Sequence, residues 1–400
     1  MNIVLLQDDF PPEAKGGAGI VAAVLAEGLV KRGHTVSVIT TTRDRVKVGK
    51  SVWGNVGVYR IWSDYPERWR AWRSLYNPRV VREVKRVLEE LKPDIVHAHN
   101  IHYHLSYGAL CAARARGAKV VLTAHDAMLI AYGKIITPPS WWQSLCGARL
   151  RFNPLRSLFI RRALSCVASV SAVSEALASA LTKAGISRVH VIHNGIAVKD
   201  WEVDSVQLNA FKEKHGLANR PILLFGGRMS TQKGGDALRT ALPEIIRVVP
   251  NLALLLVGAD TPYVREFKRQ AVEAGFGDVV VSTGWIQGEE LRAAYHAATV
   301  VAVPSLYLDP LPTVVLEAMA CCVPVVGSSF GGISEMVTDG ETGYVVDPRD
   351  AHMLVERLVS ILQNPGLARA LGEAGHRSVQ ERFTQEAYAA RVESWYQSLS

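Results

Sequence analysis

The chain has 400 residues, 48% of them hydrophobic, which is long enough for two domains with sizeable cores. No apolar run approaches the length of a membrane span, and the start, MNIVLLQDDF, lacks the basic region and the apolar stretch of a signal peptide. Residues 1–200 hold 28 Lys and Arg against 14 Asp and Glu, whereas the rest hold 17 against 23, so the basic first half predicts an anionic partner.

Short runs of Val, Ile and Leu alternate with helical patterns along the whole chain. Several runs are apolar at every position, which is typical of strands buried on both faces, and strand–helix alternation is typical of parallel sheets. The expected strands are residues 3–6, 35–39, 56–61, 95–98, 120–123, 167–172 and 189–192, then 222–225, 253–257, 279–281, 300–303 and 324–326. We therefore predict an α/β protein with two Rossmann-like, doubly wound parallel-sheet domains.

The domain boundary is expected in the polar, aperiodic stretch NGIAVKDWEVDSVQLN. This gives an N-terminal domain at 1–200, a C-terminal domain at 201–384, and a final helix at 385–400 that packs back towards the N-terminal domain. Each domain opens with a strand, a glycine loop and a helix. Because ligands of such sheets bind beyond the carboxyl ends of the strands, two facing domains would place both glycine loops in one cleft.

The second domain opens with ILLFGGRMSTQKGGDALRTAL, residues 222–242. Glycines such as Gly227 let backbone N–H groups approach an anion, and a helix N-terminus carries positive partial charge. The planar guanidinium of Arg228 and the ammonium of Lys233 both suit phosphate oxygens. Neither GxxxxGK[ST] nor GxGxxG is present, so the stretch indicates phosphate binding without the Walker or dinucleotide motif; a glycine-rich turn with two solvated cations is the alternative.

A second group of candidate residues lies in PSLYLDPLPTVVLEAMA, residues 304–320. Backbone N–H groups at Thr313 and Val314 would point out of a helix start as anion donors. Glu317, about one turn into that helix, can accept two hydroxyl hydrogen bonds, as a ribose diol requires. Asp309 can do the same for a sugar. Together with the two cations, these acids predict a site for a phosphorylated sugar compound.

The motifs resemble a known family. GGRMSTQKGGDAL, VSTGWIQGEELRAAYHAATVVAVPS and LDPLPTVVLEAMACCVPVV together are similar to the retaining GT-B glycosyltransferases of family four. In the first half PPEAKGGAGIVAAVLAEGLVKRGHTVSVIT, PDIVHAHN, VVLTAHD, VSAVSEAL and VIHNGI resemble that family in the expected order. The resemblance implies a metal-independent, two-domain enzyme of hexosyltransferase type that uses a nucleotide-diphospho-sugar, with no other cofactor.

The resemblance implies a role for each candidate. Arg228 and Lys233 hold the diphosphate and offset the charge that grows as the sugar leaves. His125, in TAHD, lies by the transferred sugar, but a role as general base is not expected, because the departing phosphate itself can take the acceptor proton. Asp309 binds the donor sugar and Glu317 the ribose. The remaining binding positions are Gly16 and Gly17 in the first glycine loop, Gly227, Leu311, Thr313 and Val314 around the phosphates, and Trp285 and Ile286 where the nucleobase packs.

Three positions depart from the family pattern. Asp309 stands where glutamate is usual and is one methylene shorter. Pro312 replaces a common glycine, which removes one N–H donor and stiffens the turn. Ala197 stands where NGID is usual. These differences suggest altered donor choice, and they leave two alternatives open: a sugar-nucleotide epimerase of the same fold, or a nucleotide-binding protein of polysaccharide assembly without transferase activity.

The segment 127–174 has no Asp or Glu. It combines cations with aromatic residues, namely Lys134, Arg149, Arg151, Arg156, Arg161 and Arg162 with Trp141, Trp142, Phe152 and Phe159. This composition favours peripheral contact with an anionic membrane or a lipid-linked acceptor, and a plain basic domain face is the alternative. No nucleic-acid recognition motif accompanies it, so nucleic acid is not expected as a partner. The expected acceptor is a saccharide or a lipid-linked glycan.

Two further patterns concern metals and location. The histidines of HAHNIHYH, residues 97–104, are irregularly spaced and lack nearby carboxylates, which favours an acceptor pocket or a loop-stabilising role over a metal site. The five cysteines are scattered without CxxC pairs, which is typical of a reducing compartment rather than of a disulfide framework. The expected location is cytoplasmic, with possible contact at the inner face of the membrane.

Overall fold

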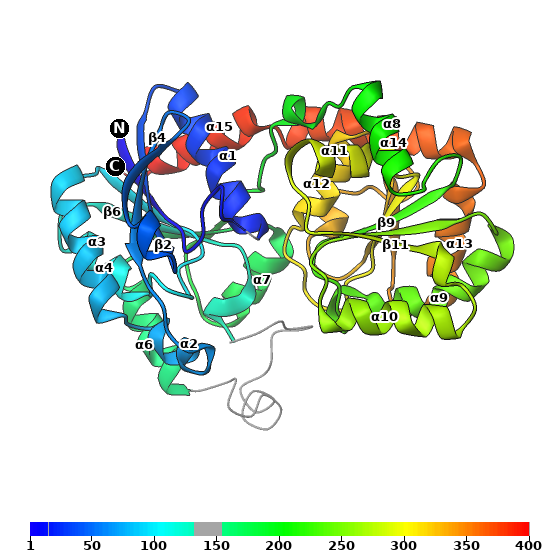
Figure 1. Cartoon of the computed structure of the whole chain (residues 1–400). Coiled ribbons are helices and arrows are strands. Elements are labelled where there is room, and N and C mark those ends of the chain that lie inside the picture. The colour runs from blue at the N-terminus through cyan, green and yellow to red at the C-terminus, as the bar shows by residue number, and fades with distance from the viewer. Residues whose placement is uncertain (15, 132–153, 400) are drawn as a thin grey trace. The chain divides into compact units, whose positions relative to one another are not determined.

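The computed structural model describes residues 1–14, 16–131 and 154–399, which divide into two compact units (Figure 1). Unit 1 comprises Met1–Gly195 and Gln385–Ser400, and unit 2 comprises Ile196–Thr384. The division falls within the polar connection that the sequence analysis assigned to the boundary. Each unit is an α/β domain with its own sheet, as predicted.

The described part of unit 1 contains an eight-stranded sheet in the order β3-β4-β2-β1-β5-β6-β7-β8. Its strands are β1 (Asn2–Leu6), β2 (Thr35–Thr42), β3 (Gly49–Trp53), β4 (Val56–Trp62), β5 (Ile95–Ala98), β6 (Lys119–Ala124), β7 (Ser169–Ala172) and β8 (Val189–Val191). All neighbours pair in parallel except β3, which runs antiparallel to β4. Strand β3 was not predicted from the sequence, because GKSVW is an exposed edge strand without an apolar run.

Helices cover both faces of this sheet (Figure 1). They are α1 (Gly17–Lys31), α2 (Arg70–Arg73), α3 (Pro78–Leu91), α4 (Gly108–Arg114), α6 (Pro154–Leu164), α7 (Glu175–Lys183) and α15 (Gln385–Gln397). Helices α1 and α15 pack against β1 and β2 around Leu5, Leu25 and Tyr388, which are all fully buried. The final helix therefore completes the core of unit 1, because its Tyr388, Val392 and Trp395 cover one face of the sheet.

The described residues of unit 2 form a six-stranded sheet in the order β11-β10-β9-β12-β13-β14, with all neighbours parallel. Its strands are β9 (Ile222–Gly226), β10 (Ala253–Val257), β11 (Val280–Gly284), β12 (Val300–Val303), β13 (Val325–Ser328) and β14 (Gly343–Val346). Every expected strand is present in both units. The additional strand β14, GYVV, was not predicted from the sequence.

The helices of unit 2 also lie on both faces of their sheet (Figure 1). They are α8 (Ser205–Lys214), α9 (Gly235–Val248), α10 (Pro262–Glu273), α11 (Gly288–Ala297), α12 (Thr313–Ala320), α13 (Ala351–Leu362) and α14 (Pro365–Arg382). One core packs α9, α10 and α13 on the sheet around Leu238, Phe267 and Leu358. Among the described residues, no helix has both the length and the apolar character that crossing a membrane requires.

One expectation about the cysteines is wrong. Cys111 on α4 and Cys166 just after α6 are joined in a disulfide, although 55 residues separate them in sequence. The scattered spacing concealed this pair because the fold brings α4 and the end of α6 together, with Cα atoms 5.2 Å apart. Cys321 is buried with a free thiol, Cys322 is exposed with a free thiol, and Cys146 lies outside the described residues.

Candidate active site

The strand order of each unit marks where a ligand should bind. In unit 2 the chain runs from β9 outward to β10 and β11 and then returns to β12 on the other side of β9. In unit 1 it leaves β1 towards β2 and returns to β5 on the other side of β1. Loops diverge at such a switch point, which leaves space for a ligand beyond the carboxyl ends of the strands. The candidate residues follow these strands.

In unit 2 the loops after β9 and β12 meet through an ion pair. The Nζ of Lys233 lies 2.7 Å from Oδ2 of Asp309, and the Oγ of Ser305 donates to the same carboxylate oxygen at 2.8 Å. The Asp309 side chain is 5% exposed and that of Lys233 25%. A buried carboxylate is costly without compensation, so these two donors hold the charge of Asp309 in place. The structure brings together these two predicted residues.

Backbone contacts fix the same loops. Gly234, directly after Lys233, has φ 86°, and a Cβ there would lie 2.0 Å from the carbonyl oxygen of Pro304. The N–H of Leu306 donates to the carbonyl of Gln232 at 2.9 Å, which ties the two loops again. Gly331 has φ 91° and approaches the backbone of Asp309 equally closely. Only glycine combines these φ values with such close approach, so the loops have a rigid backbone frame.

Arg228 lies in the same loop as Lys233 but has a different environment. Gly227, with φ 93°, and Arg228 are exposed, whereas the next residue, Met229, is 2% exposed and anchors the loop in the core. Within the part of the chain that the structure describes, Arg228 makes no ion pair. Its guanidinium therefore remains available to an anion at the carboxyl end of β9.

Helix α12 begins at the carboxyl side of β12. Leu311 is buried, Pro312 caps the helix without a side-chain hydrogen bond, and Thr313 and Val314 are half-buried in the first turn. The first N–H groups of a helix have no intrahelical acceptor and carry positive partial charge. The start of α12 can therefore donate to an anion, as the sequence analysis predicted for Thr313 and Val314.

Glu317 has a partner that the sequence analysis missed. The hydroxyl of Tyr295, on α11, donates to Oε2 of Glu317 at 2.5 Å, and Tyr295 is 1% exposed. Its ring is fixed in an edge-on contact with Trp201 at 5.4 Å between centroids. Burial raises the pKa of the Glu317 carboxyl, while the hydrogen bonds from Tyr295 and Thr313 lower it. These contacts orient the Glu317 carboxylate in the first turns of α12.

Trp285 and Ile286 follow β11, at the edge of the sheet. Trp285 is 49% exposed, while Ile286 is half-buried. Like Arg228 and the start of α12, both residues lie beyond the carboxyl ends of the strands. One strand, β10, separates β11 from β9. An exposed indole at this position offers a flat apolar surface to a base.

In unit 1 the first glycine loop is held at both ends. Gly16 caps α1 and Gly17 begins it, and both residues are exposed. Upstream, the buried carboxylate of Asp8 accepts N–H groups from Tyr103, His104 and Leu105 at 2.6, 2.8 and 2.7 Å. Asp8 thus joins the loop after β1 to the loop after β5. Burial raises its pKa to about 7, and the three backbone hydrogen bonds oppose that rise.

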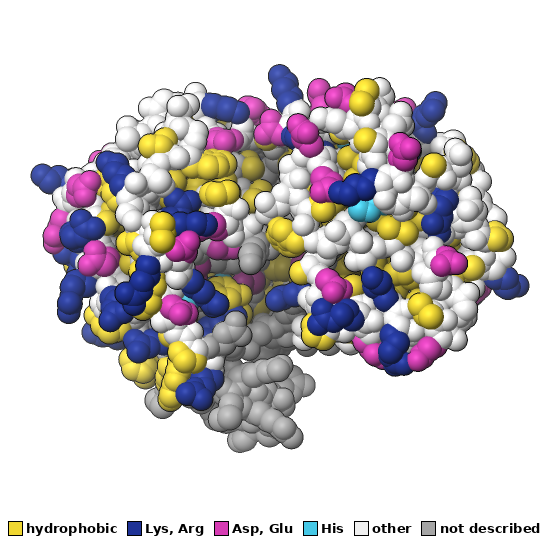
Figure 2. Space-filling view, viewed as in Figure 1, with side chains coloured by type: hydrophobic (Ala, Val, Ile, Leu, Met, Phe, Trp, Pro, Cys, Tyr) yellow, Lys and Arg dark blue, Asp and Glu magenta, His cyan; other side chains and the backbone are white. Residues whose placement is uncertain are grey.

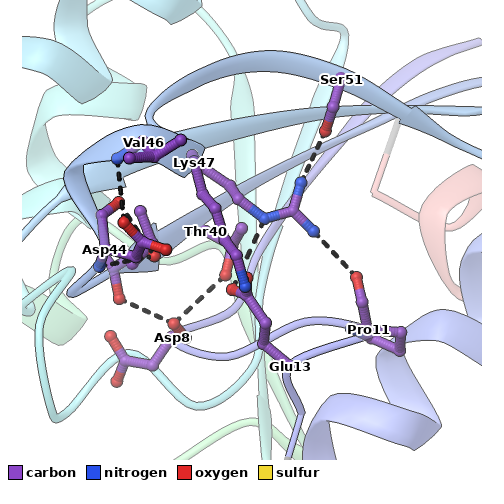
Figure 3. Close-up of polar contacts among 11 residues, drawn as sticks. Asp8, Pro11, Glu13, Thr40, Asp44, Val46, Lys47 and Ser51 are labelled. Carbon is purple, nitrogen blue, oxygen red and sulfur yellow. Dashed lines mark hydrogen bonds and ion pairs between the residues drawn. The ribbon is translucent and has the colours of Figure 1, made fainter.

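Figure 3 shows how the rest of that loop is attached to the sheet. The carbonyl oxygen of Asp8 accepts hydrogen bonds from the Thr40 and Thr41 hydroxyls. The guanidinium of Arg60, on β4, donates to Pro11 O at 2.9 Å and to Ser51 Oγ at 2.6 Å. Glu13 lies 2.6 Å from Lys47 and 3.7 Å from the same guanidinium. The unpredicted strand β3 therefore contributes, through Ser51, to the position of the glycine loop.

His125 follows β6 and belongs to a chain of histidine rings. Its Nε2 lies 2.8 Å from Nδ1 of His99, whose ring stacks on His97 at 4.2 Å. His97 in turn bonds the Tyr396 hydroxyl of α15 and the Thr123 hydroxyl of β6, each at 2.6 Å. His97 and His99 of the HAHNIHYH stretch thus position the ring of His125. Among the residues described, no group of three or more His, Cys, Asp or Glu is placed to hold a metal ion.

Burial determines the charge of these rings. It lowers the pKa of His97 to about 3 and that of His125 to about 4, and it lowers the pKa of His99 well below its ordinary value. All three imidazoles are therefore neutral at pH 7. His125 can take part in hydrogen bonds in this state, but it carries no positive charge towards a phosphate.

Two family models match this chain, one on each half. The family model described as Glycosyltransferase Family 4 matches residues 15–200, and the model described as Glycosyl transferases group 1 matches residues 208–378. A relative in Mycolicibacterium smegmatis, the GDP-mannose-dependent alpha-(1-6)-phosphatidylinositol monomannoside mannosyltransferase, is 38% identical over 187 residues. That alignment covers 45% of this chain and 49% of the relative, so the chain spans about half of that protein's length.

Solved structures share the fold along the whole chain. Sucrose-phosphate synthase from Thermosynechococcus elongatus has a TM-score of 0.81 at 25% identity and covers 99% of this chain and 98% of its own. HepE from Anabaena in complex with UDP-glucose has a TM-score of 0.73 at 20% identity and covers 99% of each chain. At 20% identity, the similarity to HepE shows a shared fold alone.

The neutral histidines predict acid sensitivity. In the unfolded chain His97 has the ordinary histidine pKa of 6.5 and binds a proton below that pH. In the folded chain its pKa is about 3, so it binds the proton only near pH 3. Unfolding then takes up protons, so the free energy of unfolding falls as the pH falls. Between pH 7.5 and 5 this amounts to about 2 kcal/mol for one such histidine.

Urea unfolding at both pH values checks this. The variant His97→Gln should be less stable than the wild type at pH 7.5, because it disturbs two buried hydrogen bonds, and it should lose less further stability at pH 5. His352→Gln, which replaces an exposed histidine of unit 2, should keep the wild-type pH dependence. An unchanged pH dependence in His97→Gln would show that His97 is not the buried neutral group inferred here.

Proposed function

The chain belongs to glycosyltransferase family four, and we propose that it transfers a glycosyl unit from a nucleotide-diphospho-sugar to a hydroxyl acceptor with retention of anomeric configuration. The observation that carries this proposal is the meeting of Lys233, Asp309 and the start of α12 at the switch point of unit 2. A diphosphate at that point would face an ammonium group, a helix N-terminus and the exposed Arg228.

Each group has a role in the proposed reaction. When the bond between the sugar and the phosphate breaks, negative charge grows on the leaving diphosphate, and Lys233 and Arg228 stabilise it electrostatically. The acceptor hydroxyl attacks the sugar, and its proton passes to an oxygen of the leaving phosphate. His125 is neutral and therefore serves as a hydrogen-bonding group for the sugar. We propose no metal ion, because these cations and the N–H groups of α12 supply positive charge.

Asp309 acquires a more specific role than the sequence analysis gave it. Its Oδ2 already accepts from Lys233 and Ser305, so we propose that Asp309 positions the lysine and offers the donor sugar only its other oxygen. Its shorter side chain fits this role, because a glutamate would carry the carboxylate one methylene further from the backbone. The departure from the family's glutamate thus becomes a candidate determinant of donor choice.

The identity of the donor, the acceptor and the cellular location are separate proposals, each stated only as a class. The Mycolicibacterium smegmatis relative uses GDP-mannose, and the Anabaena neighbour holds UDP-glucose, so UDP, GDP and ADP should all be screened by thermal shift. We propose a saccharide or lipid-linked acceptor bound by unit 1, and a cytoplasmic reaction. Product analysis with donor alone separates the alternatives: an epimerised nucleotide sugar would indicate an epimerase, and tight nucleotide binding without transfer a binding protein.

The two cations provide the first test of this function. We expect Lys233→Ala and Arg228→Ala each to lower kcat by about two orders of magnitude or more, because each removes stabilisation of the leaving group. The measurement is release of nucleoside diphosphate with the donor identified by the screen. Lys214→Ala, which breaks an exposed ion pair with Glu290 in the same unit, is the control and should retain turnover. Near-normal turnover in both test variants would contradict the proposal.

The role of Asp309 is tested by combining substitutions. If Asp309 acts mainly through Lys233, then Asp309→Asn combined with Lys233→Ala should be scarcely less active than Lys233→Ala alone. Additive losses would instead indicate an independent contact between Asp309 and the sugar. Comparing glucose and mannose donors in Asp309→Glu would further show whether the missing methylene affects donor choice.

Tyr295 gives a prediction on binding rather than on turnover. Tyr295→Phe removes the hydrogen bond that orients Glu317, so we expect about tenfold weaker binding of the nucleoside diphosphate, the magnitude typical of a hydrogen bond to a charged group. Isothermal titration calorimetry measures this directly. Tyr59→Phe removes a comparable tyrosine–glutamate contact in unit 1, to Glu90, and should leave affinity unchanged. Equal affinity in Tyr295→Phe would rule out the orienting role.

A further inference from the structure

Two segments of unit 1 expose large apolar side chains. In the first, Trp69, Trp72 and Tyr76 are 52%, 48% and 55% exposed, and in the second, on α6, Leu158 and Phe159 are 64% and 56% exposed. Single exposed apolar residues are common, but a group of this size on a domain surface indicates a contact with something apolar. Neither segment belongs to the candidate active site.

Both segments are attached to the same helix, α4. The first is fixed to the start of α4 by two backbone hydrogen bonds, from Tyr107 to the carbonyl of Ser74 at 2.8 Å and from Gly108 to the carbonyl of Leu75 at 3.1 Å. Helix α6 runs beside α4: its end is joined there by the Cys111–Cys166 disulfide.

The start of α6 lies near the first segment. Arg70, on α2, lies over the ring of Tyr103, 3.1 Å from its centroid, and that ring lies 4.8 Å from the ring of His102. His102 is 3.4 Å from Asp126, and Arg156, on α6, donates to the carbonyl of Met128 at 3.1 Å, two residues after Asp126. In Figure 1, α2 is drawn next to the start of α6, and Figure 2 shows apolar and basic side chains together on that part of the surface. We call this surface, formed by residues 68–76 and the exposed side of α6, the arginine–aromatic face.

The charge on this face is of one sign. Residues 68–76 contain three arginines and no Asp or Glu, and α6 contains three arginines and no Asp or Glu either. Arg68 and Arg73 are exposed beside Trp69 and Trp72, and Arg161 and Arg162 are exposed beside Phe159. The face therefore combines excess positive charge with apolar groups that can leave water. Residues 132–153, which hold Trp141, Trp142 and Arg149, lie outside the described residues and are not needed for this pattern.

We propose that the arginine–aromatic face docks on an anionic lipid surface. Tryptophan and tyrosine side chains are favoured at the level of lipid headgroups, Leu158 and Phe159 can enter the acyl boundary, and arginines pair with lipid phosphates. Nucleic acid would pair with the arginines, but it offers no apolar layer for a leucine and a phenylalanine exposed on one helix. A membrane accounts for both halves of the pattern.

The proposed contact is interfacial and reversible. Helix α2 is a single short turn and α6 has eleven residues, so each lies on a membrane rather than across it. Such binding depends on a few inserted side chains together with attraction to anionic headgroups, and salt weakens it. The inference goes beyond the transfer reaction, since it concerns where unit 1 is held and not what the active site does.

Vesicle flotation tests the proposal with the full chain and needs neither donor nor acceptor. Wild-type protein should float with phosphatidylcholine vesicles that contain about one third phosphatidylglycerol, and should bind pure phosphatidylcholine vesicles at least about tenfold less. Trp69→Ala/Trp72→Ala and Arg68→Gln/Arg73→Gln should each lower the partition coefficient on the anionic vesicles, the second by about thirtyfold. Raising the salt concentration should weaken wild-type binding.

Matched variants of unit 2 serve as controls. Trp285→Ala removes an indole as exposed as that of Trp72, and Arg247→Gln/Lys268→Gln removes two exposed cations, so both should bind vesicles like the wild type. Unchanged melting temperatures show that each variant is folded. Quenching of tryptophan fluorescence by brominated acyl chains should fall in Trp69→Ala/Trp72→Ala but not in Trp285→Ala.

Three results would overturn the proposal. The first is binding that does not depend on lipid charge, or no binding at all. The second is vesicle binding by Trp69→Ala/Trp72→Ala equal to that of the wild type. The third is tight binding of an oligonucleotide that releases the protein from vesicles, which would assign the face to nucleic acid. Since none of these measurements involves a nucleotide sugar, the transfer proposal is tested separately by the Lys233 and Arg228 variants.

Discussion

The buried carboxylate of Asp309 is the constraint on which the candidate site of unit 2 depends. The Asp309 side chain is 5% exposed, and Lys233 and Ser305 compensate its charge. Lys233 cannot leave without exposing an uncompensated buried charge, which would cost several kcal/mol. The lysine is therefore held where the loops after β9 and β12 meet, before any ligand arrives. Because an ammonium group has three N–H donors, Lys233 can keep this bond and still donate to a phosphate.

Unit 1 also uses a buried carboxylate to join two loops at the switch point of its sheet. Asp8 lies just after β1 and accepts three N–H groups from the loop after β5, across the switch point. In unit 2 the carboxylate meets a side chain that can also bind a ligand, whereas in unit 1 it meets backbone groups only. In unit 2 the buried carboxylate therefore positions a cation, Lys233. In unit 1 it fixes the loop after β5, which contains several histidines of the HAHNIHYH stretch.

Much of this arrangement could be predicted from the sequence, because it depends on local patterns. Apolar runs between helical segments predicted the expected strands, and the glycine loops after β1 and β9 marked the carboxyl ends at which the candidate residues lie. What could not be predicted involves partners distant in sequence. Tyr295 and Glu317 are 22 residues apart, and Cys111 and Cys166 are 55 apart. Nothing in the spacing of either pair indicates contact, since contact arises only when the sheet brings their helices together. The edge strand β3 was missed because an exposed strand needs no apolar pattern.

The uneven charge of the two halves of the chain corresponds to two different uses of positive charge, one in a local site and one on an extended surface. The second half holds the cations assigned to a diphosphate, yet its Asp and Glu outnumber its Lys and Arg by 23 to 17. A bound anion at one point requires only a few positioned donors, because charge stabilisation in a site acts over a few ångströms. Part of the excess of 28 over 14 in the first half lies at the surface, where Arg68, Arg73, Arg161 and Arg162 are exposed near aromatic groups. Net surface charge acts over about a Debye length, so it suits attraction to an extended anionic surface better than recognition of one ligand.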